Sequence, residues 1–443
     1  MRIGTWCAFA AGALAVGAWV SAEEQQLQQQ VQELQAKVAA MEAKQATNAK
    51  DLATTIDSMI RDAERRSQLL ATNGGTSAGY DNGFFIGTDD KAFYFHPWLQ
   101  FAPRYVANWR DDGKSTSSDD TEDGFEIRRM KFGFDGNLFS RDLTYTFIWA
   151  TDRNSGKPSL EEAWIKYMFA DVWGVRLGQI KDPVAHEGLV SSKRLLAVER
   201  TYLQDALGLG DNFVQGATIL YNGNNIPLRA EVGFTDGQGS ANTDFTNTVT
   251  SGTTTAKTDF GIAGRLEYKA LGDWKAYDDF TALGTTKDLL VFGIGGDWTE
   301  MGGTDVVLHT ADAQYESANG LAIYAAFLGR YVRDGTTPGG SREDFYDWGA
   351  MGQIAYLFDK HWEVFARYDY TGLDEDALSA GSQGHVHEIT TGLNCYFHGH
   401  AMKLTADVTY LPNGAPKGDG GADILPSNDH DELLFRVQFQ LLI

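Results

Sequence analysis

Several arginines and lysines stand at alternate positions in stretches where polar and apolar residues take turns. Arg129 and Lys131, for example, alternate with Met130 and Phe132. Because successive side chains of a β-strand point to opposite faces, such basic groups would share one face. A guanidinium group can pair with two oxygens of an oxyanion at once, so this face could contact anions. The candidates on predicted strands are Arg104, Arg129, Lys131, Arg265, Arg367 and Arg436.

More basic residues occur in and beside the segment 182–212. A short alternating strand ends at Asp182, and alternation resumes near Phe213. The stretch between them is too long for an ordinary connection in a compact fold. It is also too rich in Leu, Val and Tyr for a disordered loop. We expect it to fold into the mouth of a barrel and narrow the pore, with Lys181, Lys193, Arg194 and Arg200 as the candidate basic rim.

The same basic residues could instead be neutralised by nearby carboxylates. Arg265 and Glu267 are neighbours on one strand face, and the segment 182–212 contains Glu187, Glu199 and Asp205. Lumen charges that pair across strands would make a mixed-charge constriction. Direct contact with ions and internal pairing therefore both remain open for each basic residue.

Other patterns that could do chemistry are weak. Gly75–Gly79 matches the hydrolase motif G-x-S-x-G, but that motif requires a strand before it and a helix after it. A predicted linker surrounds it here. His385 and His387, like His398 and His400, have a spacing that can bind a metal, but the two pairs would lie at opposite ends of one strand. We predict no enzymatic activity, no metal site and no cofactor.

Composition narrows the class of protein. The formal net charge is −23, with 37 basic and 60 acidic residues in 443, so we expect no nucleic-acid partner. Aromatic residues make up 12% and there are 49 glycines, yet beyond the N-terminus no apolar run reaches the length of a membrane helix. A transmembrane β-barrel has this overall polarity, because its lumen-facing positions are polar.

The region 91–443 is organised in alternating segments. There are about sixteen, each near the roughly ten residues that a tilted strand needs to cross a bilayer. Long polar connections such as 111–123 and 411–432 alternate with short turns, and 270–287 is a long exception among the turns. This sorting is typical of outer-membrane barrels. We predict an all-β fold, a 16-stranded antiparallel transmembrane β-barrel, with 182–212 as its third long loop.

The N-terminal part has a different organisation. Residues 1–22 resemble a secretory signal peptide, with Arg2 before an apolar core and a small-residue cleavage site. Residues 23–71 carry a narrow apolar seam, which starts Leu27, Val31, Leu34 and predicts a periplasmic α-helical coiled coil. A single amphipathic helix lying on the barrel is the alternative. Residues 72–90 are predicted to be a flexible linker.

Five segments resemble the phosphate-selective porin O and P family. They are Phe125–Gly136, Leu160–Tyr167, Leu177–Pro183, Ser191–Lys193 with Glu199–Arg200, and Gly392–Tyr396. The resemblance covers most of residues 90–443. It implies a trimeric outer-membrane porin that is surrounded by outer-membrane lipids, folds its third loop inward and passes phosphate or other small ions. The alternatives are a general or cation-preferring porin for small polar solutes, and a structural protein that tethers the cell wall through its coiled coil.

Overall fold

The computed structural model describes the chain from Gly75 onward with short gaps. The described residues are 61, 75–80, 83–110, 121–208, 212–245, 249–251, 254–256, 258–379, 382–419, 421–427 and 430–443. The predicted signal peptide lies outside them, and so does the predicted coiled coil apart from residue 61. Within these ranges, no helix combines the length and the apolarity that a membrane crossing requires.

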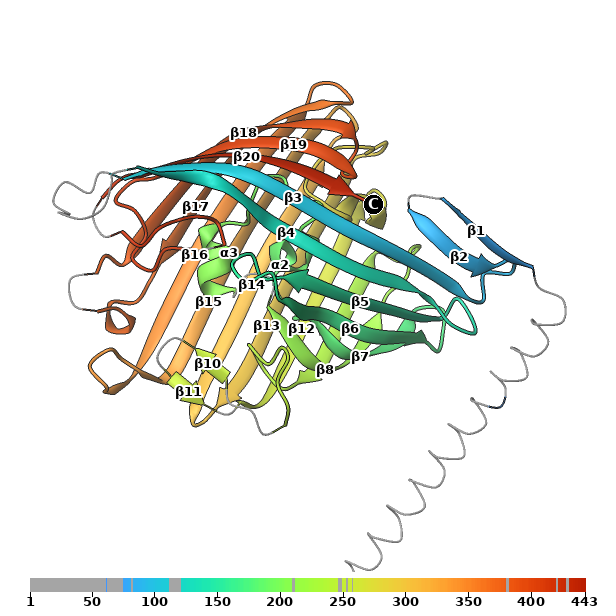
Figure 1. Ribbon diagram of the computed structural model, residues 1–443. Coiled ribbons are helices and arrows are strands. Elements are labelled where there is room, and N and C mark those ends of the chain that lie inside the picture. The colour runs from blue at the N-terminus through green and yellow to red at the C-terminus, as the bar shows by residue number, and fades with distance from the viewer. Residues whose placement is uncertain are drawn as a thin grey trace, which may run out of the picture. The chain divides into compact units, whose positions relative to one another are not determined.

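Sixteen strands of the described chain form one antiparallel barrel (Figure 1), as the sequence predicted. They are β3 (Tyr94–Arg110), β4 (Thr121–Asn137), β5 (Leu143–Thr151), β6 (Pro158–Met168), β7 (Trp173–Lys181), β8 (Phe213–Tyr221), β9 (Leu228–Thr235), β12 (Thr258–Leu271), β13 (Leu289–Met301), β14 (Thr304–Glu316), β15 (Leu321–Thr336), β16 (Arg342–Leu357), β17 (Trp362–Gly372), β18 (His385–His398), β19 (Met402–Leu411) and β20 (Glu432–Leu442). The last strand pairs with the first, with Leu433 opposite Trp109. Closure leaves neither sheet edge unpaired.

Part of the predicted linker 72–90 is a β-hairpin. Strands β1 (Thr76–Tyr80) and β2 (Phe84–Thr88) pair with each other, and Gly87 of β2 pairs with Tyr94 of β3. This stretch is therefore ordered against the barrel's first strand. Ser77, the central residue of the G-x-S-x-G match, lies within β1, and β2 follows instead of the helix that the motif requires. A second small hairpin, β10 (Val249–Ser251) and β11 (Thr254–Ala256), lies between β9 and β12.

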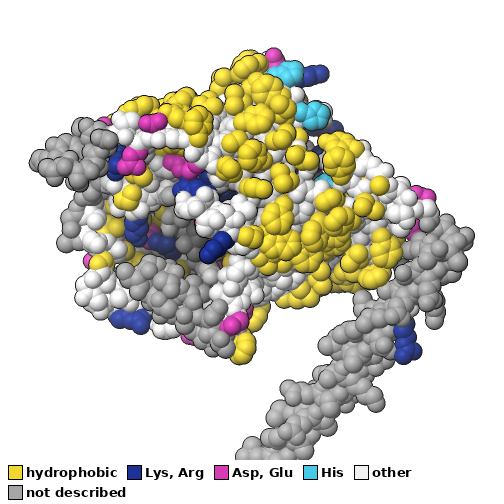
Figure 2. Space-filling view, viewed as in Figure 1, with side chains coloured by type: hydrophobic (Ala, Val, Ile, Leu, Met, Phe, Trp, Pro, Cys, Tyr) yellow, Lys and Arg dark blue, Asp and Glu magenta, His cyan; other side chains and the backbone are white. Residues whose placement is uncertain are grey.

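Side chains alternate between the outer surface and the lumen along each strand. On β20, Leu433 is 40% exposed on the outside, whereas Arg436 and Gln438 are buried inside. Figure 2 shows the hydrophobic side chains gathered on the outer wall, with charged side chains inside the hollow at one mouth. An apolar exterior around a polar interior is the arrangement that a barrel needs in a bilayer.

One break in strand register turns an additional arginine inward. Ala102 of β3 pairs with Arg129 of β4, but Pro103 pairs with Ile127, so Arg128 is skipped. Proline has no N–H for the strand ladder, and a β-bulge is a usual place for it. Arg128 therefore enters the lumen beside Arg129, although strict alternation assigns these neighbours to opposite faces.

Candidate functional site

The long connection between β7 and β8 folds into the barrel. We call residues 182–212 the inner loop; residues 209–211 of it lie outside the described chain. It contains the short helices α2 (His186–Leu189) and α3 (Tyr202–Leu207), which Figure 1 shows inside the barrel. Its buried apolar side chains pack against the lumen face of the wall; they include Val184, Val190, Leu195, Leu196, Leu203 and Leu207, and their wall partners include Leu308, Tyr324, Met351 and Phe365. The third long loop is therefore packed inside the barrel.

Polar side chains of the wall fix the inner loop by its backbone. Arg265 donates to the carbonyl of Val184 at 2.8 Å, and Lys403 donates to the carbonyl of Leu195 at 2.7 Å. Carboxylates accept from its N–H groups: Asp407 from Val198 at 3.0 Å and Glu388 from Tyr202 at 2.8 Å. A loop buried without such partners would leave its peptide groups unsatisfied. The lumen side chains are therefore matched to this loop conformation.

A glycine in the wall lets the inner loop approach closely. A Cβ on Gly295 of β13 would lie 2.3 Å from the carbonyl oxygen of Val184. We expect Gly295→Ala to push this part of the loop away and to destabilise the barrel by about 1–3 kcal/mol, the usual cost of overpacking. The measurement is the thermal unfolding midpoint in detergent. Gly296→Ala is the matched control, because a Cβ there meets only the Leu308 carbonyl oxygen, at 3.3 Å. Equal midpoints for the two variants would contradict the proposed close contact.

Three arginines converge on one carboxylate of the inner loop. Glu199 is 2% exposed and accepts from Arg104 at 2.6 Å, from Arg128 at 2.7 Å and from Arg129. Burial alone would raise the pKa of this carboxyl group, but the guanidinium groups of Arg128, Arg129 and Arg104 outweigh burial and lower it below its usual range. Glu199 is thus a fixed negative charge that joins the loop to β3 and β4. The sequence showed the residue but not this convergence.

All ten basic residues predicted to border the pore have partners inside the barrel. Arg104 and Arg129 pair with Glu199, Lys131 with Glu161, Arg265 with Glu267 and Asp312, Arg367 with Glu388, Arg436 with Asp407 and Arg194 with Asp278, while Lys181 and Arg200 donate to carbonyls of the inner loop and Lys193 lies over the Trp98 ring. Seven of the ten residues are therefore paired with carboxylates, as in the second of the two alternatives. Direct contact of these residues with ions remains a prediction.

Lys193 and Arg194 are partly exposed, like Lys181 at the end of β7, whereas the other seven residues of the set are buried. The ammonium group of Lys193 lies 2.9 Å from the centre of the Trp98 ring, and burial lowers the pKa of Lys193 to about 7. The Arg194 side chain is 41% exposed, whereas that of Arg104 is fully buried. These two neighbours are the predicted rim residues that keep a face toward solvent while belonging to the inner loop.

The long turn 272–288 also folds into the barrel, from the opposite end. It contains the 3-10 helix η1 (Trp274–Asp278), and Trp274 and Tyr277 are each 3% exposed. The Tyr277 ring stacks on His186 of the inner loop with 3.9 Å between ring centres. Gln314 donates to the carbonyl of Asp279 at 2.6 Å. Two segments that enter from opposite ends therefore meet in the lumen, and we call 272–288 the inner turn.

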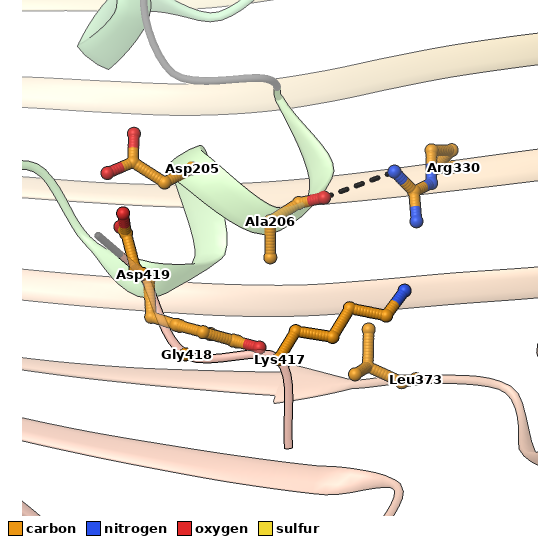
Figure 3. Close-up of a pocket in the computed structure, with 8 residues that line it drawn as sticks. Asp205, Ala206, Arg330, Leu373, Lys417, Gly418 and Asp419 are labelled. Carbon is orange, nitrogen blue, oxygen red and sulfur yellow. Dashed lines mark hydrogen bonds between the residues drawn. The ribbon is translucent and has the colours of Figure 1, made fainter. Parts of the chain in front are cut away.

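The last loop, residues 412–431, folds over the inner loop. Ile424 is 1% exposed and packs in a cluster with Tyr202 of α3. The carbonyl of Gly421 accepts from Arg128 at 2.9 Å. Figure 3 shows Asp205 of α3 facing Asp419 of the last loop. A cavity of about 240 Å³ lies beside them; its lining residues include Ala206, Arg330, Leu373 and Lys417.

Because the carboxyl groups of Asp205 and Asp419 face each other, we expect the contact between the inner loop and the last loop to stabilise the fold in a pH-dependent way. Burial, and then Asp419, raise the pKa of Asp205 well above its ordinary value of 3.8, although Arg200 opposes them. The folded protein thus holds a proton that the unfolded chain releases. This stabilisation is complete below pH 3.8 and is lost as the pH rises through the folded pKa, by up to about 1.4 kcal/mol per pH unit.

The expected result is that the unfolding midpoint of the wild type falls as the pH rises, and that Asp205→Asn shows a flatter dependence. Thermal unfolding in detergent over a range of pH measures both. Asp376→Asn, at the exposed 3-10 helix η2 (Glu375–Ala377), serves as the control and should keep the wild-type slope. Identical slopes for the wild type and Asp205→Asn would show that the carboxyl pair does not hold a shared proton.

Comparisons with known proteins agree with this architecture. Residues 106–325 match the family described as Phosphate-selective porin O and P. An uncharacterized protein of Aquifex aeolicus (strain VF5) is 26% identical over 280 residues, which are 59% of this chain. The match spans 65% of that relative's length, less than two thirds.

Two solved structures share the fold. An anion-selective porin from Comamonas acidovorans is similar with a TM-score of 0.55 and 14% identity, covering 79% of this chain and 99% of the other. OprB from Pseudomonas putida, solved at high pH, is similar with a TM-score of 0.51 and 11% identity, covering 79% of this chain and 94% of the other. At these identities the likeness establishes the fold alone, a closed antiparallel β-barrel.

Proposed function

Because residues 106–325 match the phosphate-selective porin O and P family, we propose that the chain belongs to this family and forms a constricted, water-filled channel in the outer membrane. Small ions and polar solutes would diffuse through it. The observation that carries the proposal is the inner loop, which is fixed inside a closed barrel by the lumen side chains. A barrel that served only as an anchor would not require a constricting loop with this many polar attachments.

Such a channel performs no bond chemistry. The width of its narrowest part sets which solutes pass, and the charges that line this part set the local concentration of each ion. The inner loop, the inner turn and the last loop all reduce the free cross-section. Swelling of liposomes that contain the purified protein, in sugars of increasing size, measures this limit. Swelling that does not depend on solute size would contradict a constriction.

We propose small anions, phosphate among them, as the preferred permeants. Arg194 supports this preference, because it lies on the inner loop and keeps part of its surface exposed. Lys193 beside it adds positive charge mainly below its lowered pKa of about 7. Arg128, with 23% of its side chain exposed, adds a third guanidinium or ammonium group. The second candidate is a general porin with a mixed-charge constriction, which the ion pair between Arg194 and Asp278 favours.

Reversal potentials in a KCl gradient distinguish these candidates. Anion preference predicts a potential displaced toward the chloride equilibrium value, together with inhibition of the chloride current by added phosphate. A potential near zero without phosphate inhibition would establish the general porin, and a potential toward the potassium value would establish cation preference.

The assembly and the N-terminal part are included in the proposal as predictions from the sequence and the family resemblance. We propose a homotrimer, surrounded by outer-membrane lipids, with the coiled coil 23–71 in the periplasm. Chemical cross-linking of the purified protein tests the trimer. Deletion of residues 23–70 separates a channel from a cell-wall tether, because the channel keeps its conductance whereas a tether loses its function.

A further inference from the structure

An ion pair joins the two segments that enter the lumen from opposite ends. The guanidinium group of Arg194 in the inner loop lies 3.2 Å from the carboxylate of Asp278 in the inner turn. Their side chains are 41% and 51% exposed, whereas those of Arg104 and Glu199 are 0% and 2% exposed. The Arg194–Asp278 pair is therefore in contact with water, and its charges are available to dissolved ions.

The inner turn holds Asp278 in place although the residue itself is half exposed. On its N-terminal side, the Tyr277 hydroxyl accepts from Arg265 at 2.9 Å, and the Tyr277 ring stacks on His186. On its C-terminal side, the backbone carbonyl of Asp279 accepts from Gln314 at 2.6 Å. Neighbours that are fixed on both sides give the carboxylate a defined position.

The charges around Asp278 are mainly basic. Arg194 and Arg229 both act on it electrostatically, and Lys193 precedes Arg194 in the inner loop. The carboxylate of Asp279 also acts on it, and the same carboxylate pairs with His400 at 3.2 Å. The Asp278 carboxylate therefore compensates a basic group that would otherwise face the channel water.

We propose that Asp278 is a selectivity-determining residue of the constriction. Its carboxylate neutralises Arg194 and thereby lowers the preference of the channel for anions. This inference rests on the proposed channel function. Asp278 belongs to the inner turn and acts on the same constriction as the inner loop. The charge would act directly on ions that pass within the Debye length of about 8–10 Å.

The test is the reversal potential of Asp278→Asn in a KCl gradient across a planar bilayer. The expected result is a shift toward the chloride equilibrium potential, with the chloride-to-potassium permeability ratio raised by up to about 25-fold. The Coulomb energy of a unit charge at about 4 Å in water changes the local concentration of each ion about fivefold, in opposite directions for chloride and potassium. Asp273→Asn is the matched control. Asp273 is in the same segment and 68% exposed, but its partner at 3.6 Å is Lys287 of the inner turn and not a residue of the inner loop, so the ratio should stay unchanged.

Arg194→Gln provides an independent second variant, and the expected shift is in the opposite direction. The double variant should return close to the wild-type ratio, because it removes one charge of each sign. If the wild type conducts and both Asp278→Asn and Arg194→Gln have its reversal potential, this inference is overturned while the channel function stands. Absence of any conductance in the wild type would overturn the channel function itself, and this inference with it.

Discussion

Replacing Glu199 by glutamine is expected to free the inner loop from the barrel wall. The neutral amide cannot balance the three arginines that converge on this position, and Arg104 and Arg129 would remain buried without a full countercharge. Breaking a buried ion pair from one side costs about 3–5 kcal/mol. The unfolding midpoint in detergent should fall accordingly, and the open-channel current should become noisier as the loop moves.

The pH dependence gives a second measure of the same interaction. Because the pKa of Glu199 is lowered in the folded protein, its stabilisation is present above the ordinary glutamate value of 4.5 and decreases as the pH falls below it. Glu122→Gln is the matched control: Glu122 also pairs with an arginine, Arg110, at 3.1 Å, but its side chain is 57% exposed. Such surface pairs contribute about 0–1 kcal/mol. An equal loss of stability in both variants would contradict the role assigned to Glu199.

Leu196→Asp is expected to give the largest change in conductance. Leu196 is 3% exposed and belongs to the apolar cluster between the inner loop and the wall. An unpaired carboxylate in this cluster costs several kcal/mol, more than the loop gains from any one of its hydrogen bonds. We expect the loop to leave the wall, and the single-channel conductance to rise above the wild-type value.

Leu196→Met is the control for this variant. It keeps the volume and apolar character of the side chain, so stability should change by less than about 1.5 kcal/mol and conductance should not change. Both proteins should fold, because the strand pairings that close the barrel do not involve Leu196. Wild-type conductance and noise in Leu196→Asp would show that the inner loop does not limit the channel.

The barrel could be predicted because strand alternation is a local signal. Residues two positions apart on a strand share a face, so alternation alone assigns Arg265, Arg367 and Arg436 to the polar face. All three side chains are buried. The inner loop was predictable for a related reason. A connection rich in Leu and Val must bury those residues, and in a barrel the lumen is the place available.

The partners within the lumen could not be predicted in the same way. Arg367 pairs with Glu388 on the neighbouring strand rather than with Asp369 on its own, and this choice depends on strand register. Arg128 faces the lumen because of a β-bulge in β4. The one indication of this bulge in the sequence is Pro103 on the adjacent strand. The length of 272–288 was visible in the sequence, but its inward direction depends on contacts with His186 and Gln314, which are distant in sequence.

The proposed channel is a closed barrel with the inner loop fixed inside it, and it conducts ions through a narrow, permanent opening. Single-channel recording of the purified full-length protein in planar bilayers tests it most directly. We expect stable stepwise increases in current, with little noise within each level, and larger or noisier steps for Leu196→Asp. Folded protein that inserts into the bilayer and produces no steps would contradict it.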